Sequence, residues 1–146
     1  MSQTSLFLCY CPDRTGPGVL ETRLKVRAEH FEGFKKTMEA GNAGGGSDTT
    51  TLTPEFGRAF LPSPGDALYH PERLSVLPPN VQPMAGSVMM LRYPSLEEAW
   101  ERVKADVYWT AGVWDHDRTF VTHIADPPPA GTVPGVPDAA AIGSGR

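Results

Sequence analysis

The apolar residues at the start of the chain follow two different periods. Ser5 to Cys11 (SLFLCYC) is a short apolar and aromatic run, closed by Pro12 and a Gly/Pro turn, which is typical of a β-strand. From Val19 to Ala40 the apolar residues recur at the spacing of a helix, and Gly41 is a residue that ends helices. The predicted apolar stripe of this helix consists of Leu20, Leu24, Phe31 and Met38, with Phe34 nearby. The sequence therefore predicts a strand followed by a long amphipathic helix.

The same two patterns return in the second half of the chain. Gly86 to Tyr93 (GSVMMLRY) predicts a strand. Ser95-Leu96-Glu97-Glu98 is a capping box, so a helix is expected to begin there and to run to about Asp106. The predicted apolar face of that helix consists of Leu96, Ala99, Trp100 and Val103. A bend containing Gly112 then leads to a last strand, from about Trp114 to Ile124.

The segment between these two halves has a weaker pattern. A further strand is expected somewhere between Asp48 and Ala59, where several threonines favour extended backbone. Seven prolines from Pro54 to Pro83 exclude a long regular element. Most of this segment is therefore predicted to be a large loop that contains short pieces of structure.

The predicted order of strands and helices is that of a split βαβ, ferredoxin-like α+β fold, in which two helices cover one face of an antiparallel sheet. Alternation along the first strand places Leu6, Leu8 and Tyr10 on one face, and Phe7 and Cys9 on the other. Both faces are largely apolar, and two helices can cover only one of them. A second copy of the sheet is the simplest cover for the other face, so we expect a homodimer built as an α+β barrel.

Glycine and proline indicate where the domain is interrupted. The chain of 146 residues contains 15 of each, and they concentrate in residues 41–86 and 126–146. We therefore expect a single small domain over residues 1–125 with a Gly/Pro-rich insert at about 41–86. The last residues, 126–146, are expected to be a disordered tail, because small residues and prolines bury too little apolar surface to fold.

Charge and hydropathy exclude several classes of function. The 13 Lys and Arg against 17 Asp and Glu give a formal net charge of −4, so no positive field attracts nucleic acid or an anionic membrane surface. No apolar run approaches the roughly 20 residues of a membrane helix, and the N-terminus lacks the basic region of a secretory leader. Cys9 and Cys11 lie too close on one strand to form a disulfide. A cytoplasmic protein with reduced thiols is expected.

Polar residues interrupt the apolar stripe of the first helix. Arg23, Arg27 and His30 share one line on this helix, with spacings i, i+4 and i+7. In one interpretation the arginine stems pack on apolar surface and His30 is a hydrogen-bonded boundary residue. In the other, the three residues form the cationic wall of a pocket that contains a titratable imidazole.

Asp106 lies near the end of the second predicted helix, where the helix dipole disfavours a carboxylate. A nearby cation is therefore expected. If the two helices lie side by side, Asp106 either orients His30 or pairs with Arg27. A carboxylate that fixes one tautomer of an imidazole and raises its basicity produces a general base. Tyr108, two residues further on, is close enough to donate a hydrogen bond into the same cavity, although buried aromatic residues are most often core.

Other residues that could carry chemistry are weaker candidates. Metal ligands are available in Asp115, His116, Asp117 and His123. Alternation on a strand turns His116 away from the other three, which disfavours a metal site. Cys9 and Cys11 are more typical of small core residues than of a nucleophile. No Gly-rich loop joins a strand to a helix, so no nucleotide or other cofactor is expected.

Six segments together form a pattern that extends over most of the predicted domain: SLFLCYC, Leu20 to Phe31, Ala85 to Ser87, Ser95 to Ala99, Ala105 to Tyr108 and Ala111 to Trp114. In content and order these segments resemble the YCII-related (YciI-like) family, in particular its stand-alone fungal members. The resemblance implies a dimeric α+β barrel with an active site built on a His and Asp pair, which matches His30 and Asp106. It also implies roles for Arg27 and Ser87. The chain has Asp106-Val107-Tyr108 where the family usually has Asp-Pro-Tyr.

The leading hypothesis is a cofactor-independent enzyme that acts by proton transfer on a small apolar or aromatic metabolite. The reaction would be an isomerisation, cyclisation, dehydration or elimination, with His30 as base, Asp106 orienting it and Arg27 stabilising enolate or carboxylate charge. The expected substrate-binding residues are Arg23, Arg27, Tyr10, Ser87, Tyr108 and Trp114. The fungal resemblance implies secondary-metabolite biosynthesis. The alternatives are a non-catalytic ligand-binding or accessory dimer that supports a pathway enzyme, and a structural fragment that binds another protein through its apolar sheet face.

Overall fold

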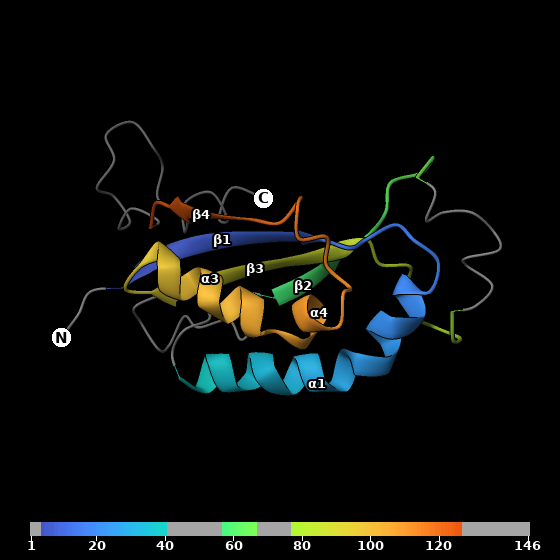
Figure 1. The fold of residues 1–146 in the computed structure, drawn as a ribbon, viewed down its shortest axis with the longest axis horizontal. Helices are drawn as coiled ribbons and strands as arrows, with labels where there is room; N and C mark the ends of the chain where they lie inside the picture. The colour runs from blue at the N-terminus through green and yellow to red at the C-terminus, as the bar shows by residue number, and fades with distance from the viewer. Residues whose placement is uncertain (1–3, 41–56, 67–76, 127–146) are drawn as a thin grey trace, which may run out of the picture.

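The described part of the chain contains one sheet of four antiparallel strands, in the order β2-β3-β1-β4, with its helices on one side (Figure 1). The computed structural model describes residues 4–40, 57–66 and 77–126. The elements in chain order are β1 (Ser5–Pro12), α1 (Val19–Glu39), β2 (Gly57–Phe60), β3 (Gly86–Tyr93), α3 (Leu96–Ala105), α4 (Val107–Thr110) and β4 (Phe120–Ile124). This architecture confirms the ferredoxin-like α+β fold predicted from the sequence.

The core lies between the helices and one face of the sheet. Cys9 at the centre of β1 is opposite Met89 on β3 and Val121 on β4, and all three side chains are buried. Because side chains alternate along a strand, Phe7 and Cys11 point to the same face as Cys9. The helices add Phe34, Ala99, Val103 and Tyr108 to this cluster. The sheet is therefore covered on this face by side chains from α1, α3 and α4.

Several predicted elements agree with the structure, and their ends differ. The cap of α3 is confirmed, because Ser95 Oγ accepts from the Glu98 amide at 3.2 Å. The predicted strand between Asp48 and Ala59 corresponds in part to β2, and residues 48–56 lie outside the described residues. The last strand begins only at Phe120, because a turn precedes it. In this turn the backbone carbonyl of Asp115 accepts hydrogen bonds from the amides of Arg118 and Thr119. Most of the predicted insert, and almost all of the tail, also lies outside the described residues.

The buried side of α1 differs from the predicted apolar stripe. Phe31 is 54% exposed, so its assignment to the buried stripe was wrong. The buried residues of α1 are instead Arg23, His30, Phe34 and Thr37. The physical reason is that α1 lies against α4 (Figure 1). It also borders a cavity, where polar groups from other elements form hydrogen bonds with its polar side chains. Leu96 at the start of α3 is also exposed, at 45%.

The second face of the sheet carries half-buried apolar side chains. Tyr10 on β1 stacks on Phe60 with ring centroids 5.1 Å apart and also contacts Phe120, which is 47% exposed. Phe60 can lie there because Gly86 has no side chain, since a Cβ on Gly86 would come within 2.2 Å of the Phe60 ring. Within the described residues, none of the helices has the length and apolar character needed to span a lipid bilayer.

Candidate active site

Asp106 lies in the break between α3 and α4, and this break aims its side chain. Its backbone is extended, with φ −68° and ψ 141°, so α3 ends at Ala105 and the short helix α4 begins at Val107. The carboxylate accepts a hydrogen bond from the backbone amide of Tyr108 at 2.9 Å, which caps α4. The predicted helix thus ends where predicted, but the carboxylate also serves as the cap of α4, a helix that the sequence analysis did not predict.

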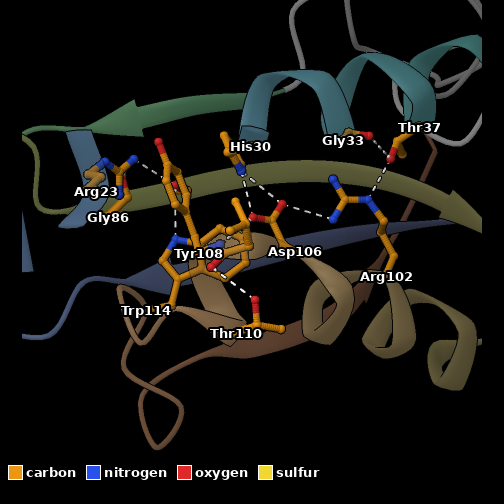
Figure 2. Close-up of polar contacts among 12 residues, drawn as sticks. Arg23, His30, Gly33, Thr37, Gly86, Arg102, Asp106, Tyr108, Thr110 and Trp114 are labelled. Atoms are coloured by element: carbon orange, nitrogen blue, oxygen red, sulfur yellow. Dashed lines mark hydrogen bonds and ion pairs between the residues drawn. The ribbon is translucent and has the colours of Figure 1, made fainter. Parts of the chain in front are cut away.

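His30 and Asp106 form a buried hydrogen-bonded pair that joins α1 to the α3–α4 break (Figure 2). Nδ1 of His30 lies 2.8 Å from Oδ1 and 2.9 Å from Oδ2 of Asp106, and the carboxylate side chain is 1% exposed. Burial alone would raise the pKa of Asp106. The hydrogen bond and charge of His30, the Arg102 cation and the Tyr108 amide outweigh burial and hold this pKa below its ordinary value.

The ionised carboxylate determines the tautomer of the neutral imidazole. An ionised Asp106 can only accept hydrogen bonds, so Nδ1 of His30 carries the proton and donates it. The lone pair of the neutral ring is then on Nε2, with which no described residue forms a hydrogen bond. The arrangement therefore presents an oriented imidazole with an available base nitrogen.

Arg102 is the cation beside Asp106, in place of Arg27. Its Nη1 donates to Oδ2 of Asp106 at 3.0 Å from one turn earlier on α3, and its Nε donates to Thr37 Oγ1 on α1 at 2.6 Å (Figure 2). The Thr37 hydroxyl donates in turn to the carbonyl of Gly33. Arg102 was not among the expected site residues, although its i, i+4 spacing to Asp106 indicated an ion pair.

The ring of Tyr108 lies between His30 and Arg23. It stacks on the imidazole with centroids 4.0 Å apart and planes 14° apart, and the Arg23 guanidinium lies 4.5 Å from its centroid. The side chain is 1% exposed, and burial raises the pKa of its hydroxyl against the opposing charges of Arg23 and Arg27. The ring of Tyr108 therefore limits the movement of the His30 imidazole, and its hydroxyl stays protonated at neutral pH.

Arg23 is the centre of a second buried network. Its Nη1 donates to Oδ1 of Asp13 at 2.6 Å, and its Nη2 donates to Ser87 Oγ at 3.0 Å and to the Gly86 carbonyl at 3.3 Å. Trp114 Nε1 also donates to Ser87 Oγ, at 3.2 Å. Burial raises the pKa of Asp13 to about 6, although the Arg23 charge opposes the change. This network ties α1 to the ends of β1 and β3.

A cavity of about 260 Å³ borders both networks. The expected site residues that line it are Arg23, Arg27, His30, Ser87 and Tyr108. Apolar walls come from Phe31, Phe34, Met84 and Met89. A volume of this size is at the small end of ligand pockets, which fits a compact metabolite. A second, more open hollow of about 400 Å³ adjoins the His30–Asp106 pair. His30, Asp106 and Arg102 are among the residues that line it.

The remaining expected site residues lie outside this cavity lining. Asp106 lies behind His30, and Trp114 is fully buried and reaches the site only through its hydrogen bond to Ser87. Tyr10 lies on the opposite face of the sheet, because it is opposite Val88 while its neighbour Cys11 is opposite Ser87.

The weaker candidates occupy other surroundings. Cys9 and Cys11 are fully buried free thiols, and burial raises the pKa of both, to about 12 for Cys9, so neither forms a thiolate readily. His116 stacks on Trp109 with centroids 3.6 Å apart, while Asp115 pairs with Arg118. In the part of the chain that is described, no three His, Cys, Asp or Glu side chains cluster as metal ligands.

Comparisons with known proteins place this geometry in context. No family model matches the chain, so membership of the YCII-related family stays a prediction. Aspercryptin biosynthesis cluster protein B of Emericella nidulans is 29% identical over 116 residues, which are 77% of this chain and 61% of that protein. The chain thus matches less than two thirds of this relative's length.

A solved structure has the same fold. It is 5-chloro-2-hydroxyhydroquinone dehydrochlorinase (TftG) from Burkholderia phenoliruptrix AC1100 in complex with 2,5-dihydroxybenzoquinone. The TM-score is 0.55 at 20% sequence identity, and the match covers 82% of this chain and 93% of TftG. At this identity the likeness supports the α+β fold assignment and leaves the function to be argued from the site.

Proposed function

We propose that the chain is a cofactor-independent enzyme that uses His30 as a general base on a small metabolite. The observation that carries this proposal is the buried His30–Asp106 pair, because it combines an oriented imidazole with an adjacent cavity. Asp106 is held on three sides, by His30, by Arg102 and by the Tyr108 amide. Such a fixed carboxylate stabilises the imidazolium that forms when the base takes a proton.

The proposed chemistry is proton abstraction next to a carbonyl group. His30 Nε2 takes the proton from carbon, and the electron pair of the broken C–H bond moves to the carbonyl oxygen to form an enolate. In an isomerisation or cyclisation, the imidazolium returns the proton to a different atom. In an elimination, the enolate expels a leaving group, which takes up the proton. Asp106 stays ionised throughout and fixes the tautomer of His30.

Two similar proteins support this proposal, one through its reaction and the other through its biosynthetic context. TftG is a dehydrochlorinase on the same fold, and its printed ligand is a single-ring quinone. The protein of similar sequence is named as a member of the aspercryptin biosynthesis cluster, so we propose a step in secondary-metabolite biosynthesis for this chain. The proposed chemistry and the 260 Å³ cavity both suit a compact, largely apolar or aromatic substrate.

We further propose that the chain belongs to the YCII-related family and forms its α+β barrel as a homodimer. The face of the sheet opposite the helices supports this proposal, because Leu8, Tyr10, Val88 and Met90 are only half-buried there and Phe120 is 47% exposed. A symmetric copy of the same face would cover these side chains.

Metabolite profiling after deletion of the gene tests the proposed function. We expect one intermediate to accumulate, and the purified chain to convert it without added metal or cofactor. The product should be an isomer of that intermediate, or should have lost one small molecule such as water or a hydrogen halide. A metabolite profile that deletion leaves unchanged, or an accumulated compound that the purified chain does not alter, would instead favour the accessory role.

A further inference from the structure

Ser87 is oriented to donate a hydrogen bond into the cavity. A hydroxyl has one proton and two lone pairs, and Ser87 Oγ accepts from both Arg23 Nη2 and Trp114 Nε1. Because both lone pairs are engaged, the proton of Ser87 has to point away from these two donors. Ser87 lines the cavity, so a ligand acceptor can receive this proton.

Tyr108 supplies a second donor to the same space. Its side chain is buried and lines the cavity, yet no described residue forms a hydrogen bond with its hydroxyl. The hydroxyl itself is not among the buried polar atoms without a partner, so it is accessible from the cavity, where a ligand acceptor can receive its proton.

Arg27 supplies a positive charge that is not neutralised within the described residues. It forms no ion pair there, and its guanidinium lies 5.2 Å from the centroid of the Phe31 ring. It precedes His30 by about one helical turn and lines the same cavity. By contrast, Arg23 is paired with Asp13, and Arg102 is paired with Asp106.

No carboxylate is among the residues that line this cavity in the described part of the chain. The acids of the two neighbouring networks are already engaged, Asp13 by Arg23 and Asp106 by His30 and Arg102. The polar lining therefore offers several donors, which include the guanidinium groups of Arg23, Arg27 and Arg58, and the one oriented base nitrogen is His30 Nε2. A neutral, donor-rich ligand would leave these donors unpaired.

We propose that the cavity recognises its ligand by an anionic oxygen, a carboxylate or phenolate on a single ring, which Arg27, Ser87 and Tyr108 bind together. The proposal rests on the proposed function for the identity of the site, since it makes these residues the substrate's anchor beside His30. The charge is present before any reaction, so the preference for an anion is a property of binding and is measurable without turnover.

Matched pairs of ligands test this proposal on the full chain. Benzoate is compared with benzamide, and 4-nitrophenolate, above its pKa, with nitrobenzene; binding is followed by the NMR signal of the Trp114 indole. We expect the anion of at least one pair to bind about tenfold tighter or more than its neutral analogue. The pair that shows the preference identifies carboxylate or phenolate as the anchor.

Three variants test which residues cause the preference for the anion, and a fourth variant controls for the loss of a positive charge. Arg27→Gln should abolish the preference, while Ser87→Ala and Tyr108→Phe should each weaken anion binding about threefold to tenfold. Lys25→Gln removes the same charge from an exposed position of α1 and should change neither affinity. Equal binding of anion and neutral analogue, no binding of any probe, or a preference that survives all three variants would overturn the proposal.

These results are independent of catalysis. If turnover survives loss of His30 while the anion preference depends on Arg27, the proposed reaction fails and the anionic site stands. If turnover depends on His30 but no anion preference exists, the reaction stands and the proposed anchor is wrong.

Discussion

Arg102 Nη1 lies 3.0 Å from Oδ2 of Asp106, the carboxylate oxygen that also lies 2.9 Å from Nδ1 of His30. The same guanidinium donates to Thr37 on α1, so Arg102 holds the helix that carries His30 and the carboxylate that orients it. Arg102 does not line the 260 Å³ cavity. We therefore regard it as a positioning residue for the pair.

Replacing Arg102 should weaken the pair without removing it. Arg102→Gln should lower kcat about tenfold, less than the roughly 10²-fold to 10⁴-fold expected for loss of a general base. Because Arg102 is one of the charges that lower the pKa of Asp106, the acid limb of the pH–rate profile should also move to higher pH. Arg102→Lys should restore part of both effects. An unchanged pH profile in Arg102→Gln would show that Arg102 has only a structural role.

The two buried aspartates should titrate far apart in the folded chain. Carbon-13 NMR of the carboxyl groups should give a midpoint near pH 6 for Asp13 and one below the ordinary value of 3.8 for Asp106. Burial dominates at Asp13, whereas hydrogen bonds and neighbouring cations prevail over burial at Asp106. The account of the site would be wrong if Asp106 titrated above its ordinary pKa.

These opposite shifts predict opposite effects of pH on stability. The pKa of Asp106 is lower in the folded chain, so its contribution to stability is present above its ordinary pKa and is lost as the pH falls through the folded value. The pKa of Asp13 is raised to about 6, so stability contributed by its proton is lost as the pH rises from about 4 through 6. Urea unfolding of Asp106→Asn should be less sensitive to acid than that of the native sequence; equal acid sensitivity would contradict this assignment.

Removing only one partner of the buried Asp13–Arg23 pair should destabilise the fold more than removing both partners. Arg23→Met leaves an uncompensated buried carboxylate, which should lower the free energy of unfolding by about 3–5 kcal/mol. The double variant Arg23→Met with Asp13→Leu removes both charges and should recover most of that loss in urea unfolding. If the double variant were as unstable as the single one, the hydrogen bonds of Arg23 to Gly86 and Ser87 would be the dominant contribution.

A single charge on the open sheet face should separate the proposed dimer. Phe120→Asp places a carboxylate on β4 at a side chain that is 47% exposed, and burying that charge against a second sheet is unfavourable. Leu96→Asp is the matched control, since Leu96 is 45% exposed but lies on α3. Light scattering should show a dimer for the native sequence and the control, and a monomer for Phe120→Asp. A native monomer, or a dimer that tolerates Phe120→Asp, would contradict the proposed interface.

Much of the fold follows from local patterns in the sequence. The alternation in β1 and β3, the period of α1 and the capping box at Ser95 all predict elements that the structure contains. The break at Asp106 was harder to foresee, because its extended backbone is stabilised by its own cap on Tyr108 and by partners on other elements. The apolar period over Val19–Glu39 predicted that a helix forms there. It did not predict which side of the helix is buried, since Phe31 is exposed.

The buried stripe of α1 depends on contacts distant in sequence. Arg23 is buried because Asp13 and Ser87 engage it, and His30 is buried because Asp106 and Tyr108 do. None of these partners lies on α1, so its own sequence does not report them. For Arg102 only the contact to Thr37 on α1 is distant in sequence, since Asp106 is its i+4 neighbour.

His30, held by Asp106, is the group that we propose transfers the proton. The most direct test is kcat on the compound that accumulates in the gene deletion, measured for the native sequence, His30→Ala, Asp106→Asn and the exposed control Lys35→Gln. We predict that the two site variants lose about 10²-fold to 10⁴-fold in kcat with a nearly unchanged Tm, and that Lys35→Gln keeps full activity. Product formation at the native rate in both His30→Ala and Asp106→Asn would contradict the claim.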